Sequence, residues 1–180
     1  MSLFYGTMLP MSLLHKYLPE FVYGSIDGTV TTFAIIAGAA GAGFSPVVML
    51  VLGVSNVLAD AWSMASSNYL SAKSEAQRDG DAHEYQAALH RALATFSAFV
   101  LVGSLPLLSY IASFAFGFGR GHEFTTSIIL TALAFLWIGA LRGRIAKVSV
   151  WKTALETFLI GAVAALVSYG VGSWVETLIR

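Results

Sequence analysis

Long apolar stretches dominate this sequence of 180 residues, and short polar segments separate them. A helix that crosses the hydrocarbon core of a bilayer needs about 20 mostly apolar residues. Five stretches meet this requirement, at about residues 21–43, 46–70, 92–116, 125–145 and 151–179. The pattern predicts an all-α, polytopic membrane protein whose five transmembrane helices form one domain over residues 1–180.

The connections between these stretches are short, with one exception. Residues 43–46 form a tight turn in which a glycine ends one helix and a proline begins the next. Residues 73–90 are the only long polar segment, and we expect them to form a cytoplasmic loop. The first twenty residues are expected to be a short cytoplasmic lead-in.

The composition agrees with lipid as the surrounding medium. Hydrophobic residues make up 57% of the chain and charged residues 11%, whereas soluble domains carry about 25% charged residues. Basic and acidic residues balance at ten each, so we expect no nucleic-acid partner. Cysteine is absent, which excludes disulfides and thiolate metal sites.

The basic residues gather on one side of the predicted topology. Arg120 and Arg180 lie on the side opposite the N-terminus, and the remaining basic residues lie on the N-terminal side: Lys16, Lys73, Arg78, Arg91, Arg142, Arg144, Lys147 and Lys152. Because cytoplasmic segments are enriched in Lys and Arg, the N-terminus is predicted to be cytoplasmic and the C-terminus outside. The lack of an address signal favours a prokaryotic plasma membrane over an organelle.

Carboxylates inside the predicted spans are the first candidates for function. Asp27 lies in the first span and Asp60 in the middle of the second, where an ionised side chain costs several kcal/mol. Such residues usually mark ion or proton pathways, although a structural hydrogen bond to a neighbouring helix is an alternative. Glu156 and Glu176 lie nearer the ends of the fifth span and are interpreted as interfacial.

The second span carries a polar stripe. At about 100° per residue, six polar or sulfur-bearing residues share an arc of about 100°: Asn56, Asp60, Ser63, Met64, Ser67 and Ser71. Such a stripe must face protein or water rather than lipid. A packing seam of small residues would suit the serines, but it suits an ionisable Asp60 beside Met64 less well.

The chemistry of the stripe favours a transition metal. Oxygen ligands alone favour Mg²⁺ or Ca²⁺, whereas the thioether of Met64 favours softer ions. Asp60, Asn56 and Met64 together suit weakly held Fe²⁺, Mn²⁺ or Co²⁺. The first span offers a matching face, on which small residues follow Asp27 at steps of three and four. We therefore interpret Asp27, Asn56, Asp60 and Met64 as candidate metal ligands along an ion path, with helix packing as the alternative for the small residues.

Other polar groups are weaker candidates. Glu75, Asp79 and His83 are spaced by four residues and could collect metal on one helical face, but a solvated loop is the favoured interpretation. His122 and Glu123 are interpreted as a polar turn. No nucleophile–base pair or soluble-enzyme motif is present, so we predict a protein that is not an enzyme and that has no catalytic residue and no permanently bound cofactor.

Two segments resemble a known family. FVYGSIDGTVTTFAIIAG, residues 21–38, resembles the first helix of the vacuolar iron transporter family, and LADAWSMASSNYLSAKSE, residues 58–75, resembles its second helix and the segment after it. The resemblance implies five transmembrane helices, a homodimeric bundle and an ion path between the subunits. It also implies export of Fe²⁺ or Mn²⁺ from the cytosol in exchange for protons, with Asp27 and Met64 matching the pathway aspartate and methionine.

The chain departs from this family in two places. Plant members have a glutamate eight residues before the methionine, whereas this chain has Asn56, and Asp60 is a candidate to supply the missing charge. Larger members insert a cytoplasmic metal-binding domain after the second helix, where this chain has about twenty residues. It therefore resembles a short form of the family. A metal channel with the same lining and a non-transporting membrane assembly or anchor protein remain the alternative functions.

Overall fold

The computed structural model describes residues 17–80 and 82–179, apart from the side chains of residues 82, 84 and 86. Residues 1–16, which hold most of the predicted lead-in, and residues 81 and 180 lie outside the described part. Within it, all regular elements are helical: α2 (Leu18–Gly41), α3 (Pro46–Asp79), α4 (Ala82–Gly103), the 3₁₀ helix η1 (Leu105–Leu107), α5 (Leu108–Phe116), α6 (Glu123–Ile145) and α7 (Val150–Ile179). Five helical stretches are long and apolar enough to cross a membrane, and α4, η1 and α5 together contribute one of them. The prediction of an all-α protein with five transmembrane helices is confirmed.

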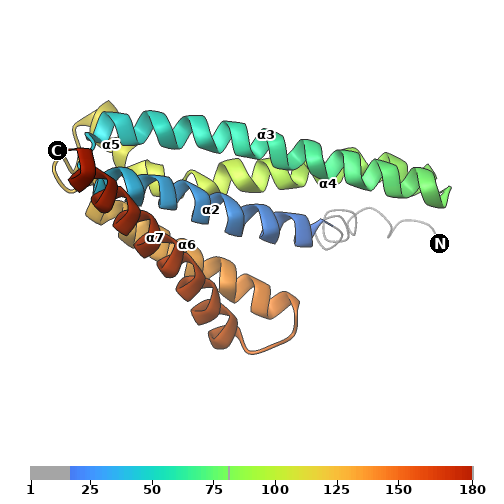
Figure 1. Ribbon diagram of the computed structural model, residues 1–180. Coiled ribbons are helices and arrows are strands. Elements are labelled where there is room, and N and C mark those ends of the chain that lie inside the picture. The colour runs from blue at the N-terminus through green and yellow to red at the C-terminus, as the bar shows by residue number, and fades with distance from the viewer. Residues whose placement is uncertain (1–16, 81, 180) are drawn as a thin grey trace.

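Helix α2 lies at the centre of the bundle. Figure 1 shows α3 and α4 running side by side along α2, whereas the hairpin of α6 and α7 diverges from them to form a V. Helix α2 contacts both arms, since it packs against α3 and α4 in one and against α6 and α7 in the other. The helix that carries Asp27 is therefore the element that joins the two arms.

The third span is interrupted at Pro106, which has no backbone N–H to donate. The surrounding hydroxyl groups compensate within the bundle. The Ser127 hydroxyl donates to the Pro106 carbonyl oxygen at 2.6 Å. The Thr29 hydroxyl of α2 donates mainly to the Ser25 carbonyl oxygen, at 2.8 Å, and also lies 3.5 Å from the Val102 carbonyl oxygen. A broken helix is tolerated in hydrocarbon when neighbouring helices satisfy its backbone in this way.

The polar segment 73–90 is helical rather than a loop. Helix α3 continues to Asp79, and α4 begins at Ala82. The segment after Ser71 is rich in good helix formers and contains neither glycine nor proline before Gly80, so the helix continues beyond the apolar stretch. Gly80 ends it in the left-handed conformation, at φ 71°, which glycine adopts without steric cost. The prediction of a loop was therefore wrong, because among the described residues of this segment Gly80 alone is non-helical.

Glycines allow the helix backbones to approach closely at two crossings. A Cβ atom on Gly103 of α4 would lie 2.9 Å from the carbonyl carbon of Gly28 on α2. At the other arm, a Cβ on Gly172 of α7 would collide with the carbonyl oxygen of Gly38 on α2. Membrane helices commonly associate through such small residues, because packing replaces the hydrophobic driving force that lipid cannot supply.

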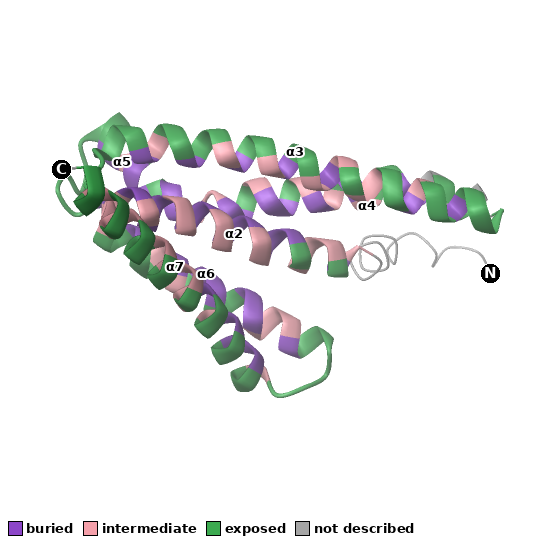
Figure 2. Ribbon diagram, viewed as in Figure 1, coloured by how far each residue is buried: buried purple, intermediate pink, exposed green. Residues whose placement is uncertain are grey.

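The outer surface of the bundle is apolar. Figure 2 shows that α7 is exposed along most of its length, and its outer face carries large apolar residues such as Val163, Leu166 and Trp174. A soluble monomer rarely exposes a continuous apolar surface of this extent. This surface is consistent with lipid as the medium around the five spans.

We expect Gly172→Ala to destabilise the bundle by about 1–3 kcal/mol, because the added methyl group has no space at the crossing with α2. Gly170→Ala is the matched control on the same helix, since a Cβ there would meet no atom within 4 Å. Thermal unfolding in detergent checks both variants. Equal midpoints for the two variants would show that the α2–α7 crossing is not tightly packed.

Candidate functional site

Asp27 occupies a partly buried position on α2, one residue before the tight crossing with α4. The hydroxyl group of Thr31 donates to the main-chain carbonyl oxygen of Asp27 at 2.9 Å, so it serves the backbone and not the carboxyl group. The position of the carboxylate is therefore set by the packing of α2.

The polar stripe of α3 lies beside the face that packs into the bundle. The packed face is formed mainly by small residues at steps of four, including Gly53, Val57, Ala61 and Ala65. On the stripe, Asn56, Asp60 and Met64 are partly buried, whereas the serines are exposed: Ser63, Ser67 and Ser71. Met64 also packs against the buried core cluster. The stripe thus reaches the surface of the single chain, although the bundle around it is apolar.

Asp27 of α2 and Asp60 of α3 lie within electrostatic range of each other, on two helices that pack together. Their carboxyl groups lie close enough to repel each other when both are ionised. Within the described part of the chain, the ion pairs use other residues, and no basic side chain pairs with either of these two carboxylates. An unbalanced pair of carboxylates in a membrane domain is suited to a cation or to protons.

Asn56 has a buried amide nitrogen, Nδ2, with no hydrogen-bond partner in the structure described. A buried amide without a partner costs roughly 1–3 kcal/mol, so its acceptor is expected to come from outside the described chain. The same residues also hold no group of three or more histidine or acidic side chains that could bind a metal. Within the described residues, a single chain therefore assembles no cluster of this kind around Asn56 or the two carboxylates.

The structure separates the remaining sequence candidates. Glu75 and Asp79 lie on α3 and His83 lies on α4, beyond the turn, so the three do not share one helical face. Asp79 pairs with Arg78 at 2.9 Å.

The two glutamates of α7 differ in their surroundings. Glu156 pairs with Arg142 at 3.1 Å and is exposed, as expected of an interfacial residue. Glu176 is partly buried and takes part in a contact of its own, so neither glutamate is an unpaired carboxylate.

The sequence suggested that Glu123 belongs to a solvated polar turn. The structure shows otherwise. Glu123 is buried in the first turn of α6, where its carboxylate accepts hydrogen bonds from the Ser113 hydroxyl at 2.5 Å and from the Gly121 N–H at 2.9 Å. It therefore joins α5, α6 and the glycine-rich turn between them, residues 117–122. The sequence did carry a signal for this position. An acidic residue that follows a glycine-rich turn and precedes an apolar helix indicates the first turn of that helix, because acidic residues stabilise a helix N-terminus.

A second polar contact escaped the sequence analysis. Asn68 of α3 donates from Nδ2 to the Thr95 hydroxyl of α4 at 2.7 Å, and Thr95 donates to the Arg91 carbonyl oxygen at 3.0 Å. Asn68 is separated from the stripe because it points toward α4. Its spacing in α3 alone could not reveal this partner, which lies 27 residues away in the sequence.

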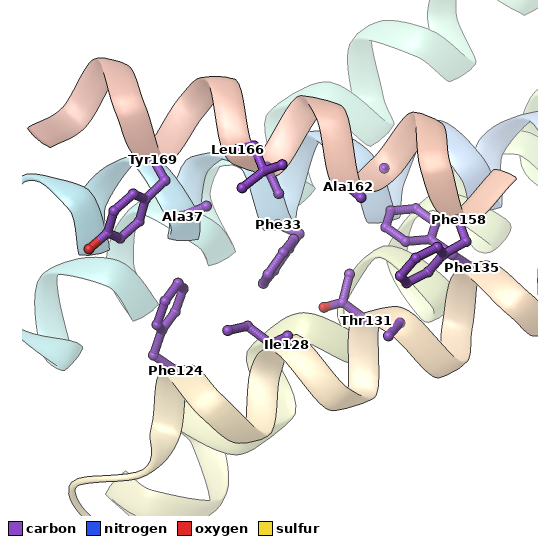
Figure 3. Close-up of a pocket in the computed structure, with 13 residues that line it drawn as sticks. Phe33, Ala37, Phe124, Ile128, Thr131, Phe135, Phe158, Ala162, Leu166 and Tyr169 are labelled. Carbon is purple, nitrogen blue, oxygen red and sulfur yellow. The ribbon is translucent and has the colours of Figure 1, made fainter. Parts of the chain in front are cut away.

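The pocket in Figure 3 is apolar, in contrast to the polar stripe and the two carboxylates. It measures about 340 Å³ and lies between α2, α6 and α7, where Phe33, Phe124, Phe158 and Leu166 line it. Thr131 and Tyr169 are its polar side chains, and the Thr131 hydroxyl already donates to the Ser127 carbonyl oxygen at 2.7 Å. This lining is apolar and suits no metal ion, so the pair of carboxylates remains the candidate site.

Comparison with known sequences decides the family. The model of the VIT family matches residues 18–80 and 77–173, which is most of the chain. The protein belongs to the VIT family. This membership identifies it as a multi-pass membrane protein of a family of metal-ion transporters and confirms the resemblance seen in its first two helices.

Curated relatives extend over nearly the whole VIT chain. A vacuolar iron transporter of Toxoplasma gondii is 24% identical over 91% of this chain and 76% of its own length. Vacuolar iron transporter 1 of Eucalyptus grandis is 27% identical over 88% of this chain and 86% of its own. The vacuolar iron transporter of Plasmodium falciparum reaches 44% identity, but only over 34% of this chain.

We expect Asp27→Asn to raise the midpoint of thermal unfolding of the metal-free protein, because it removes repulsion between Asp27 and Asp60. The expected rise is about 2–4 °C, the shift that about 1 kcal/mol produces in a chain of this size. Glu156→Gln should change the midpoint little, since its ion pair with Arg142 is exposed. A fall of more than 5 °C in Asp27→Asn would identify Asp27 as a structural carboxylate.

Proposed function

We propose that this VIT-family protein exports Fe²⁺ or Mn²⁺ from the cytosol along a path lined by α2 and α3. The observation that carries the proposal is the pair of carboxylates, Asp27 and Asp60, which no described basic residue neutralises. Their mutual repulsion is relieved when a divalent cation binds between them or when a proton binds to one of them. The same pair can therefore hold either the metal ion or the exchanged proton.

Two copies of the chain are required to complete this path. Ser63, the exposed serine of the stripe that lies within the hydrocarbon part of α3, would face lipid in a single chain, and lipid offers its hydroxyl group no partner. A two-fold axis at the stripe places it against its own copy, because the same surface then serves both subunits. It also doubles the ligands, so that the Asp27 and Asp60 carboxylates of both subunits surround one seam. Homodimerisation is thus part of the proposal.

Met64 accounts for the preference for a transition metal. Its partly buried thioether lies one turn beyond Asp60 on the same stripe. A thioether binds softer ions better than Mg²⁺ or Ca²⁺, and mixed oxygen and sulfur ligands hold Fe²⁺ or Mn²⁺ weakly enough for release. The names of the relatives, which are vacuolar iron transporters, support iron as the cargo.

The proposed direction of transport, out of the cytosol, combines the export that the family resemblance implies with the proposed topology. Basic residues concentrate at the turns after α3 and α6, on the side where α2 begins, which favours a cytoplasmic N-terminus and an outer C-terminus. Metal enters from the cytoplasm, meets Met64, then the pair of Asp60 and Asp27, and then Asn56, which lies one turn nearer the outer end of α3. Protonation of the carboxylates from the far side weakens the site and releases the ion. A prokaryotic plasma membrane remains the predicted location.

We expect Met64→Leu to reduce Fe²⁺ or Mn²⁺ flux into proteoliposomes by about tenfold, because it removes the thioether and keeps the volume. Met49→Leu is the matched control: Met49 lies on the same helix but is buried in the core, where its sulfur accepts from the Tyr110 hydroxyl at 3.3 Å. Asp27→Ala should abolish flux.

Unchanged flux in both Asp27→Ala and Met64→Leu would defeat the assignment of the path. A proton gradient distinguishes a carrier from a channel. In an exchanger, a proton gradient changes the metal flux even when the membrane potential is held at zero. In a channel, the gradient changes the metal flux only through the membrane potential that it creates.

The proposed subunit boundary can be tested by cross-linking, because the natural chain has no cysteine. Ser63→Cys or Ser67→Cys, on the exposed stripe, should give covalent dimers on mild oxidation in membranes. Disulfides form only between Cα atoms within about 7 Å, so both positions are tested. Ser66→Cys, on a different face of α3, is the control and should remain monomeric. Monomers throughout would place the boundary elsewhere.

A further inference from the structure

An apolar groove runs between α3 and α4, on a different face of α3 from the polar stripe. It measures about 490 Å³, within the range of about 300–1,000 Å³ that is usual for ligand pockets. Its shape follows from residue size: Ala65, Ser66 and Ala92 allow a hollow between the helices, while Trp62 and Leu93 flank it as large exposed side chains. We refer to it as the α3–α4 groove.

The groove ends close to the surface of the bilayer. A hydrocarbon core of about 30 Å takes about 20 residues of helix, so a span that starts at Pro46 leaves the hydrocarbon near Ser66. Tyr69 and Leu70, at this end of the groove, therefore lie where the headgroups begin. Figure 1 shows α3 and α4 continuing together beyond α2 in this direction.

A positively charged side chain, Lys73, lies near the end of the groove formed by Tyr69 and Leu70. The ammonium group of Lys73 lies 5.6 Å from the ring centroid of Tyr69, which lines the groove, and 5.4 Å from that of Tyr85 on α4. Tyrosine rings from both helices thus hold the ammonium one turn beyond the groove. The backbone of Lys73 lies about 10 Å beyond Ser66, at about 1.5 Å per residue, so its long side chain has to reach back toward the bilayer to meet the headgroups.

Lys73 differs from the paired arginines nearby. Arg78 pairs with Asp79 and Arg91 with Glu20, whereas no described carboxylate pairs with Lys73. A positioned ammonium that no described carboxylate pairs with, at the end of an apolar groove open to lipid, is complementary to one kind of molecule: an acyl chain with an anionic headgroup.

We propose that the α3–α4 groove binds an anionic phospholipid from the leaflet on the side where α2 begins. One acyl chain occupies the groove against Trp62 and Leu93, and the negatively charged headgroup contacts the Lys73 ammonium. This proposal depends on the five membrane spans and not on the proposed metal path, so either can fail alone.

Trp62 provides a direct measurement. The full chain carrying Trp137→Phe, Trp151→Phe and Trp174→Phe retains one tryptophan, in the groove. In vesicles, brominated phosphatidylglycerol should quench its fluorescence with a relative binding constant about fivefold above that of brominated phosphatidylcholine, as one lysine near the surface predicts.

Variants separate the groove from a general attraction to anionic lipid. In the single-tryptophan chain, Lys73→Gln should lower the ratio to about one, while Lys73→Arg and Lys152→Gln should preserve it. Ser66→Phe should fill the groove from a partly exposed position and reduce quenching by both lipids. Equal quenching by the two lipids, or an unchanged ratio in Lys73→Gln, would overturn the proposal. Absence of quenching would also overturn it and would indicate that a second protein copy covers the groove.

Discussion

The low tolerance of hydrocarbon for unpaired polar groups shapes this protein at every level. At the break in the third span, hydroxyl groups of α2 and α6 reach the backbone carbonyls that Pro106 and its neighbours expose. Elsewhere, buried threonines donate to their own helix, as Thr157 does to the Thr153 carbonyl oxygen at 2.8 Å. Buried threonine hydroxyls in the bundle are therefore mostly satisfied by carbonyl groups of their own helix, and this makes the exceptions informative.

Asp27 and Asp60 are the main exceptions. Neither has a basic partner in the described chain, and they lie close enough to repel each other. Glu123 shows the contrast, since two hydrogen bonds occupy its carboxylate and tie α5 to α6. Both kinds of carboxylate are costly in a membrane domain, but only the unsatisfied pair retains capacity for a cation. This difference, more than the presence of acidic residues, separates the proposed transport site from a structural contact.

Close backbone packing and the site are linked through α2. Gly28 directly follows Asp27 and lies against Gly103 of α4, while Gly38 lies against Gly172 of α7. The carboxylate is consequently positioned by rigid helix contacts on both arms of the V and not by hydrogen bonds of its own. A site held in this way leaves its ligand oxygens available. It also makes the geometry of the proposed metal path depend on glycines at the helix crossings.

The sequence alone determined the number and type of spans, because length and apolarity are local properties that lipid selects directly. It also identified the stripe of Asn56, Asp60 and Met64, since helical periodicity places these residues on one face. It did not reveal that α3 and α4 extend through residues 73–90, because helix-forming residues continue where hydropathy ends. Only the tertiary structure decided that Asp27 meets Asp60, that Asn68 turns away to Thr95, and that Glu123 is buried. These outcomes depend on which helices become neighbours, and that is set by packing between residues far apart in the chain.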